Sequence, residues 1–294
     1  MPSTCFTLVR GRAMRVTRLN ACGDPVFGPA STVASEGFIS VALTANTEEG
    51  ETITQTNANG KICISDQPAP TFTGYSVEVQ FCNVDPDLYA LMTGQAIVLD
   101  DSTPAPVTVG FQVNSDVNLD DSGFALELWS GVPGAACGVG GDPQYGYLLI
   151  PFLKGGVIGD FTIENAAITF TITGANSKDG TSWGVGPYDV LKESSGAAGP
   201  LLEPLPTTNH LHMQLTTLPP PDTDVCGAAA LGTEDTTATA GSPSVSDPGT
   251  YYPAGMTGVT ASPATAWATG EYAQDWTGAK FHWDGTTWSA GVAA

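Results

Sequence analysis

Short runs in which apolar and polar side chains alternate every two residues dominate this chain from about residue 37 onward. Successive side chains of a β-strand point to opposite faces, so each run predicts a strand with one buried face. The predicted inward residues are Ile39, Val41 and Leu43; Val77, Val79 and Phe81; Val107, Val109, Phe111 and Val113; and Phe124, Leu126 and Leu128. The 35 glycines and 22 prolines suit turns between short strands, so we predict an all-β fold.

Two segments depart from this simple alternation. The run from Tyr147 to Leu153 is continuously apolar, which is typical of a strand covered on both faces and predicts the centre of the core. In the segment from Asp160 to Gly174, Phe161 and Ile163 are predicted to point inward, but the later apolar residues Ile168, Phe170 and Ile172 follow the other phase, so the phase changes near residues 165–167. A one-residue change of phase moves side chains to the other face, so we expect a bulge or a strand corner there.

One segment, from Asp85 to Gly94, has the signals of a short α-helix. Asp85 can cap the first turn, and Pro86 suits the first helical position, where no backbone N–H is needed. Gly94 can end the helix in a left-handed conformation. The residues predicted to pack against a sheet are Leu88, Leu91 and Met92.

A change of composition after Pro219 divides the chain into three predicted parts. A main domain occupies residues 1–222, with a basic N-terminal arm at 1–20. Residues 223–250 are rich in Pro, Thr, Ser and Gly without apolar periodicity, which predicts a linker. Residues 251–294 form a small β module, with strand turns expected at residues 275–278 and 284–285.

Four of the six tryptophans lie in this C-terminal module, at Trp267, Trp276, Trp283 and Trp288. Aromatic faces pack well on sugar rings and on partner proteins, so these residues are candidates for surface binding. A module of about 40 residues also needs large aromatic side chains to form any core. We favour the core, with surface binding as the alternative.

Charge is distributed unevenly along the chain. The formal net charge is −21, from 30 acidic and 9 basic residues. Affinity for nucleic acid depends mainly on lysines and arginines that neutralise phosphates, so an acidic surface disfavours adhesion to DNA. The basic exception is the N-terminal arm, which contains Arg10, Arg12, Arg15 and Arg18 and has no acidic residue up to that point.

The sequence shows neither an export signal nor an apolar run long enough to span a membrane. We therefore expect a protein that is made and retained in a cytosol or released by lysis, without membrane insertion. The six cysteines form no C-x-x-C pair, so we expect small buried thiols and neither a zinc site nor a disulfide framework. They are Cys5, Cys22, Cys63, Cys82, Cys137 and Cys226.

One acidic segment has the spacing of a calcium-binding loop. Its candidate ligands are Asp116, Asn118, Asp120 and Glu127. Asp121, however, occupies the position where the sharp turn of such a loop requires glycine. An acidic turn between two strands is therefore the favoured interpretation, with a calcium site as the weaker alternative.

No other constellation predicts chemistry. His210 and His212 are expected on one strand face with Gln214, which provides at most half of a metal site. The glycines at residues 138–141 lack the helix and lysine of a phosphate-binding loop. Without a G-x-S-x-G or H-E-x-x-H motif, we predict no catalytic residue, no cofactor and no enzymatic activity, although paired carboxylates stay open.

Several stretches of the sequence resemble the major tail proteins of siphoviruses, the long-tailed phages, that infect high-GC Gram-positive hosts. They sample residues 10 to about 215 and are RGRAMRVTRLNACGDPVFGP, SEGFISVALTANTEEGETITQTNANGKICIS, VDPDLYALMTGQ and PFLKGGVIGDFTIENAAITFTITGANSKDGTSWGVGPYDV. The resemblance implies a structural protein with a tail-tube-type β-sandwich flanked by a short helix. Six copies would form a ring in which their strands close a central β-barrel, and stacked rings would build the tail tube.

The resemblance also implies partners and a location. The partners would be further copies of this chain, the tape measure, tail terminator and distal tail proteins, and double-stranded DNA that passes through the lumen without specific binding. The protein would reside in the virion after assembly in the host cytoplasm. The predicted contacts between rings are the N-terminal arm and a polar loop from Asn46 to Gly60, within which we name Asn46, Thr47, Glu48, Glu49 and Glu51.

Two other classes of protein are consistent with the sequence. One is a virion decoration or minor tail protein, which would share the composition but stay monomeric or trimeric. The other is a carbohydrate-binding adhesin that acts through the aromatic C-terminal module.

Overall fold

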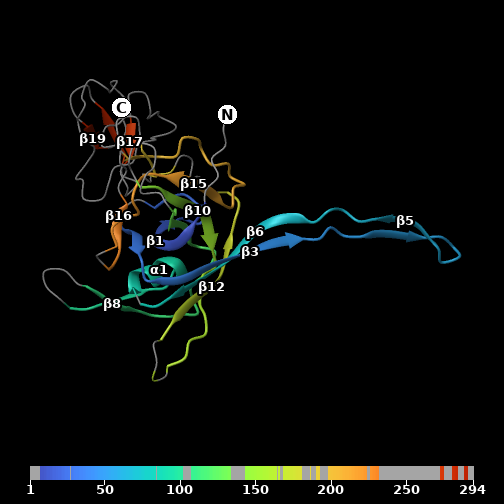
Figure 1. The fold of residues 1–294 in the computed structure, drawn as a ribbon, viewed down its shortest axis with the longest axis horizontal. Helices are drawn as coiled ribbons and strands as arrows, with labels where there is room; N and C mark the ends of the chain where they lie inside the picture. The colour runs from blue at the N-terminus through green and yellow to red at the C-terminus, as the bar shows by residue number, and fades with distance from the viewer. Residues whose placement is uncertain are drawn as a thin grey trace.

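The computed structural model describes residues 7–26, 28–83, 85–101, 107–133, 143–163, 165, 168–180, 186, 190–192, 198–223 and 226–231, and the backbone of three later strands. These residues form a mainly β protein with a large antiparallel sheet and one short α-helix (Figure 1). The prediction of an all-β fold with one short helix is therefore confirmed. Among these residues, no helix is long and apolar enough to cross a membrane.

The large sheet contains ten strands. Eight follow the order β16-β2-β1-β9-β10-β12-β6-β3, while β15 pairs with β10 and β11 pairs with β12. Their bounds are β1 (Val9–Leu19), β2 (Gly28–Ser35), β3 (Phe38–Glu48), β6 (Thr71–Phe81), β9 (Gly123–Gly131), β10 (Tyr145–Lys154), β11 (Val157–Ile158), β12 (Phe170–Ser177), β15 (His212–Thr216) and β16 (Ala229–Leu231).

The remaining strands form small antiparallel sheets of two or three strands. The two-stranded sheets pair β4 (Ile53–Thr56) with β5 (Ile62–Asp66), β7 (Ile97–Leu99) with β8 (Thr108–Phe111), and β13 (Leu191–Lys192) with β14 (Ala198–Gly199). The three-stranded sheet consists of β17 (Tyr272–Gln274), β18 (Lys280–Trp283) and β19 (Trp288–Ala290). The turns predicted at residues 275–278 and 284–285 lie outside the described residues.

Strands β9 and β10 are buried on both faces of the large sheet. One face contributes Phe124, Leu126, Ile150 and Leu153 to a first core, which also contains residues of β1, β6, β12 and the helix. The other face contributes Ala125, Trp129, Tyr147, Leu149 and Phe152 to a second core. The continuously apolar run from Tyr147 to Leu153 therefore lies at the centre of the molecule, as predicted. Each fully buried leucine, isoleucine or phenylalanine side chain stabilises the fold by about 1.5–3 kcal/mol.

The inward faces predicted for β6 and β9 are confirmed, whereas that of β3 is correct only in part. Val41 and Leu43 of β3 pack against the first core, but Ile39 is 50% exposed. The pairing of β3 with β6 is irregular between Phe38 and Ser40. Because this irregularity changes the phase of the strand, Phe38 packs against the core in place of Ile39.

The prediction for the run from Val107 to Val113 is wrong. Val107, Val109 and Val113 are exposed, since β8 pairs with β7 as a separate ribbon and not with the large sheet. Only Phe111 turns toward the first core, where its ring stacks on Tyr89 at 5.2 Å between ring centroids.

The segment from Asp160 to Gly174 also differs from its prediction. Strand β12 begins only at Phe170, and the predicted inward residues Phe161 and Ile163 are exposed. Phe170 pairs with Phe81, the last residue of β6, so earlier residues have no β6 residue opposite them. The irregularity in pairing lies between Ile172 and Ala175, several residues after the predicted change of phase.

Helix α1 (Pro86–Thr93) confirms the predicted helix and its caps. The Asp85 carboxylate accepts hydrogen bonds from the backbone N–H groups of Asp87 and Leu88, and Gly94 is left-handed with φ of 70°. The predicted inward residues are buried in the first core, and Tyr89 is buried with them. The helix therefore covers the face of the sheet that carries this core.

Strand β16 lies inside the segment predicted as a linker, so that prediction is wrong for Ala229–Leu231. These residues pair with β2 at the end of the large sheet. The preceding turn is held by α1, because Gly227 N donates to Asp85 at 2.9 Å and Ala228 N donates to Asp87 at 3.1 Å. The sheet thus continues past the predicted boundary at residue 222, and residues 232–250 lie outside the described residues.

The cysteines differ from their prediction as well. The four with described side chains, Cys22, Cys63, Cys82 and Cys226, are exposed free thiols and not buried ones. Cys63 lies on a solvent-exposed strand, and Cys22, Cys82 and Cys226 lie in connections between elements, where a small side chain is not covered. Cys5 and Cys137 lie outside the described residues.

Candidate assembly surface

A long β-hairpin extends away from the body of the protein (Figure 1). Its two sides are the outer parts of β3 and β6, continued by β4 and β5, and we call residues 47–73 the projecting hairpin. The expected polar loop from Asn46 to Gly60 is therefore wrong as a loop, since it contains the end of β3 and the whole of β4, which are both paired. The positions Ile53 and Gln55, and Ile62 and Ile64, are spaced two residues apart, which is compatible with two paired strands. The polar residues around them hid this strand pattern in the sequence.

The tip of the projecting hairpin is a turn organised by Asn57. The Asn57 side chain accepts hydrogen bonds from the backbone N–H groups of Asn59 and Lys61, each at 3.0 Å. Gly60 has φ of 75°, a conformation that glycine adopts without steric cost. This local chemistry explains why the chain reverses here.

The projecting hairpin exposes apolar side chains to solvent. Every residue of β4 and β5 is exposed, including Ile53 at 60% and Ile62 at 64%, and Phe72 closer to the body is 45% exposed. An isolated two-stranded ribbon is only marginally stable in water, and exposed apolar strands favour pairing with another chain. The exposed apolar side chains of the hairpin are therefore of the kind found on binding surfaces.

The projecting hairpin is also acidic. Its ionisable side chains are Glu48, Glu49, Glu51, Asp66 and Lys61. The predicted contact residues Thr47, Glu48, Glu49 and Glu51 are all exposed on it. Asn46 differs, because its amide donates to Ser76 Oγ at 2.8 Å, and Ser76 donates to Asn176 at 2.6 Å. Asn46 thus lies at the root of the hairpin within an internal network.

Strand β3 adds a free sheet edge to this surface. It pairs with β6 on one side, and no strand of the described residues pairs with its other side. All of its 11 residues are exposed or only partly buried. Such an edge presents unpaired backbone N–H and C=O groups, which natural proteins usually cover or disrupt. The free edge of β3 and the projecting hairpin form one continuous candidate surface for assembly.

The predicted N-terminal arm is instead a central strand. Residues Val9–Leu19 form β1, which lies between β2 and β9 in the large sheet. The arm prediction gave weight to the arginines alone, but the intervening Ala13, Met14 and Val16 are buried in the core. Burial of these apolar side chains in the sheet stabilises the fold, whereas an exposed arm would leave them in water.

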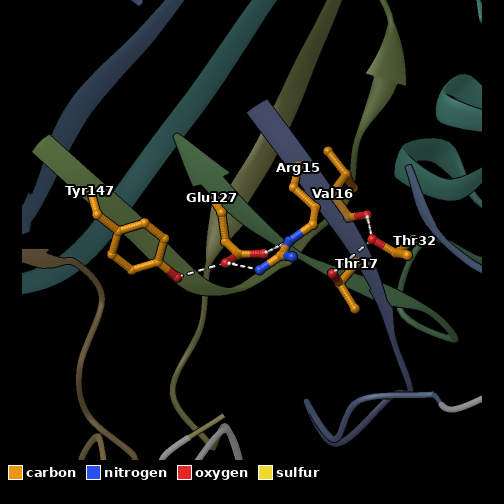
Figure 2. A network of polar contacts seen from close by, with 6 residues as sticks. All are labelled: Arg15, Val16, Thr17, Thr32, Glu127 and Tyr147. Atoms are coloured by element: carbon orange, nitrogen blue, oxygen red, sulfur yellow. Dashed lines mark hydrogen bonds and ion pairs between the residues drawn. The ribbon is translucent and has the colours of Figure 1, made fainter. Parts of the chain in front are cut away.

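Arg15 is engaged within its own subunit. Its guanidinium donates two hydrogen bonds to Glu127, from Nε at 2.6 Å and from Nη2 at 2.7 Å (Figure 2). Glu127 is fully buried and also accepts a hydrogen bond from the Tyr147 hydroxyl at 2.7 Å. Arg15 also lies 5.3 Å from the centre of the Trp129 ring. Its predicted role in contacts between rings stays a prediction.

The other three arginines are exposed but do not form one cluster. Arg10 and Arg12 lie in the first part of β1, where the pairing of β1 with β9 is irregular. Arg18 lies near the other end of the strand and lines a hollow together with the acidic residues Asp87, Asp116 and Asp121. Their role in contacts between rings stays a prediction.

The structure separates the ligands of the calcium candidate. Asp116, Asn118 and Asp120 lie in a turn before β9, where Asn118 bonds internally to Asp121 at 2.8 Å. Glu127 lies within β9, and its carboxylate is occupied by Arg15 and Tyr147. The calcium loop is thus not formed, and no metal-binding group of three His, Cys, Asp or Glu side chains occurs in the part of the chain with described placement.

The two histidines have different partners. His212 lies on β15 and its Nε2 atom contacts Gln214 Oε1 at 2.9 Å, which agrees with the predicted shared face. His210 precedes β15 and contacts Ser177 and Asp179 at the root of the projecting hairpin. The sequence analysis missed the contact between His210 and Ser177, because these residues are 33 positions apart and no local pattern links them.

Two predicted features cannot be placed. The glycine loop at residues 138–141 lies outside the described residues, as do Trp267 and Trp276 and the side chains of Trp283 and Trp288. Surface binding by these tryptophans stays a prediction.

No protein-family model matches this chain, and a search of the curated proteins gives no significant match. The fold and surface define an all-β protein with a free sheet edge and a projecting hairpin. Its function is inferred from these features.

Proposed function

We propose that this protein is a structural subunit that assembles with copies of itself into stacked rings, which form the tail tube of a long-tailed phage. The observation that carries this proposal is the continuous exposed surface formed by the β3 edge and the projecting hairpin. Both features are unfavourable in a protein that stays a monomer, and both are favourable in a subunit that binds its neighbours.

The free edge of β3 supports closure of a ring. Pairing with a strand of the neighbouring copy would satisfy the backbone groups of β3, and repetition around a rotation axis would leave no free edge. Six copies would thus close a β-barrel around a central channel. The projecting hairpin would then reach the next ring, where burial of Ile53 and Ile62 stabilises stacking.

The charge of the chain supports passage of DNA through such a channel. A net charge of −21 repels phosphate, so an acidic lumen would let DNA slide without specific binding. In this proposal the tube meets the tape measure, tail terminator and distal tail proteins in the virion. The role of the protein is structural and not enzymatic.

Negative-stain electron microscopy of purified protein tests the proposal. We expect the wild-type chain to form rings or tubes with a central channel. The double variant Ile39→Lys with Thr44→Lys places charges at exposed positions on β3 and should stay monomeric, because charged edge strands resist pairing. The control Val113→Lys adds a charge at an exposed position away from β3 and should assemble normally.

Other outcomes would support the alternative classes. A wild-type protein that stays monomeric at all concentrations and binds glycans through its C-terminal module would favour the adhesin. Discrete trimers without tubes would favour a decoration or minor tail protein.

A further inference from the structure

The projecting hairpin has a structural break at its root. Asn46 pairs with Gly74 and Thr47 pairs with Phe72, so Thr73 is an additional residue on β6 and forms a bulge. A bulge bends its strand and increases the local twist. Gly74 follows with φ of 131°, a conformation that residues with a Cβ rarely adopt. The bulge and Gly74 therefore set the point at which the hairpin leaves the body.

Among the described residues, no contact beyond this point holds the hairpin in one direction. All residues of β4 and β5 are exposed, and the ribbon is joined to the body only through its two sides. The direction of the hairpin is therefore decided by contacts at its root.

Three polar side chains meet at this root. Ser177 Oγ accepts a hydrogen bond from the backbone N–H of Tyr75 at 2.7 Å and lies 2.8 Å from His210 Nδ1. His210 Nε2 lies 2.9 Å from Asp179 Oδ1. The imidazole thus connects the end of β12, the segment before β15 and, through Ser177, the base of the hairpin on β6.

Aromatic packing reinforces the same contact. The Phe72 ring meets His210 edge-on, with 5.4 Å between ring centroids, and meets Tyr75 in a similar way at 5.1 Å. A Cβ on Gly74 would lie 2.6 Å from Ser177 Oγ and 3.1 Å from His210 Nδ1, so only glycine permits this approach. The root is therefore closely packed as well as hydrogen-bonded.

A serine, a histidine and an aspartate that contact one another in this order are also the groups of a catalytic triad, but the geometry argues against nucleophilic catalysis. Ser177 is only 4% exposed, and its hydroxyl oxygen lies beneath Gly74 while it accepts the Tyr75 amide. A nucleophile must reach the reacting atom of a substrate. The three residues are therefore better explained as a structural connection.

We propose that Ser177, His210 and Asp179 form a clamp that fixes the direction of the projecting hairpin in the free subunit. Its purpose rests on the proposed function: a hairpin held in its docking direction loses less conformational entropy when a neighbouring copy binds. The clamp itself is a property of the single chain and can be tested in the unassembled protein.

Distances between two spin labels test the clamp directly. Cys63 on the hairpin and Cys22 on the body are exposed and accept labels, after the other four cysteines are changed to serine. The variant His210→Phe keeps a ring for Phe72 but removes both nitrogen contacts. We expect a narrow distance distribution for the labelled parent chain and a roughly twofold broader one for His210→Phe, measured at concentrations too low for assembly.

Matched controls separate the clamp from general effects of mutation. His212→Phe makes the same change on β15, where the side chain contacts Gln214, and should leave the distribution narrow. Asp179→Asn keeps an acceptor for His210 Nε2 and should also leave it narrow. If His210→Phe does not fold, the smaller change Ser177→Ala removes the Tyr75 acceptor and should broaden the distribution. We call His210→Phe and Ser177→Ala the clamp variants. A folded clamp variant with the narrow distribution of the parent would overturn the proposal.

Assembly provides a second measurement. The clamp variants should need a roughly tenfold higher protein concentration to form tubes, while His212→Phe should match the wild type. If the wild-type chain forms no tubes, the proposed function fails, but the distance measurement still decides whether the clamp exists.

Discussion

At the scale of single residues, Glu127 shows how a charge is accommodated in a strand that is buried on both faces. Removing a carboxylate from water costs several kcal/mol unless its oxygens are paired. Both Glu127 oxygens are paired here, through the two-point contact with Arg15 and the hydrogen bond from Tyr147 (Figure 2). The sequence made Glu127 a weak candidate for a calcium ligand, because the spacing pattern contains no information about Arg15 more than 100 residues away.

The Arg15 to Glu127 pair gives the first prediction. The substitution Arg15→Met leaves the Glu127 carboxylate buried without its cation and should lower the free energy of unfolding by about 3–5 kcal/mol. Arg12→Met on the same strand removes an exposed arginine and should change stability by no more than about 0.5 kcal/mol. Urea unfolding measures both. Equal effects would mean that Arg15 acts only as a surface residue.

Tyr89 gives a prediction about pH. Its hydroxyl is buried without a hydrogen-bond partner among the described residues, and burial raises the pKa of this phenol above its ordinary value. Above pH of about 10 the unfolded chain releases the proton while the folded chain retains it, so stability falls as pH rises. Tyr89→Phe should therefore raise the free energy of unfolding by about 1 kcal/mol at neutral pH and weaken the alkaline decline.

Tyr147→Phe is the matched control for Tyr89→Phe. It removes a buried hydroxyl that does have a partner, Glu127, and should destabilise the protein by about 1–3 kcal/mol. Thermal unfolding between pH 7 and pH 11 compares the two variants. A loss of stability in Tyr89→Phe at neutral pH would contradict the assignment of an unpaired hydroxyl.

At the scale of elements, Asp85 joins helix α1 to the large sheet. One carboxylate oxygen caps the helix, and the other accepts the Gly227 N–H just before β16. Local signals were sufficient to predict the helix and its caps, because Asp, Pro and Gly act through their own backbone positions. They could not predict β16, because that strand exists only by pairing with β2, nearly 200 residues earlier in the chain.

Substitutions at Asp85 separate these two roles. Asp85→Ala removes both the cap and the acceptor for Gly227, so it should cost about 2 kcal/mol of unfolding free energy. Asp85→Asn can still cap the helix with its amide oxygen and should cost about half as much. An Asp85→Asn variant that loses no stability in chemical denaturation would mean that the contact with Gly227 contributes nothing.

At the scale of the whole molecule, the large sheet curls around the first core while its last strand leaves the body. The ring of Phe38 on β3 lies against Gly11 of β1, within 2.7 Å of where a Cβ on that glycine would be. Beyond this contact β3 has a free edge and continues into the projecting hairpin (Figure 1). The body thus has its own core, whereas the edge and the hairpin are the parts that the proposed assembly would cover.

Removing the hairpin should therefore separate folding from assembly. Gly50 and Pro68 lie opposite each other, since a Cβ on Gly50 would be 2.7 Å from Pro68, so an Asn-Gly turn can replace residues 51–67. We expect a change in unfolding free energy within about 1 kcal/mol, because β4 and β5 are wholly exposed. Electron microscopy should show single rings without stacked tubes. Normal tubes would exclude the hairpin from contacts between rings.

The sequence by itself determined the class of fold, the short helix with both caps, and the doubly buried strand at Tyr147 to Leu153, because these follow from local periodicity and from the backbone preferences of Asp, Pro and Gly. Only the tertiary structure decided that the basic N-terminal segment is a central strand and that Asn46 to Gly60 is part of a hairpin. It also decided that His210 meets Ser177 at the root of that hairpin. These outcomes depend on which distant strands pair, and pairing energy is spread over residues that are far apart in the chain.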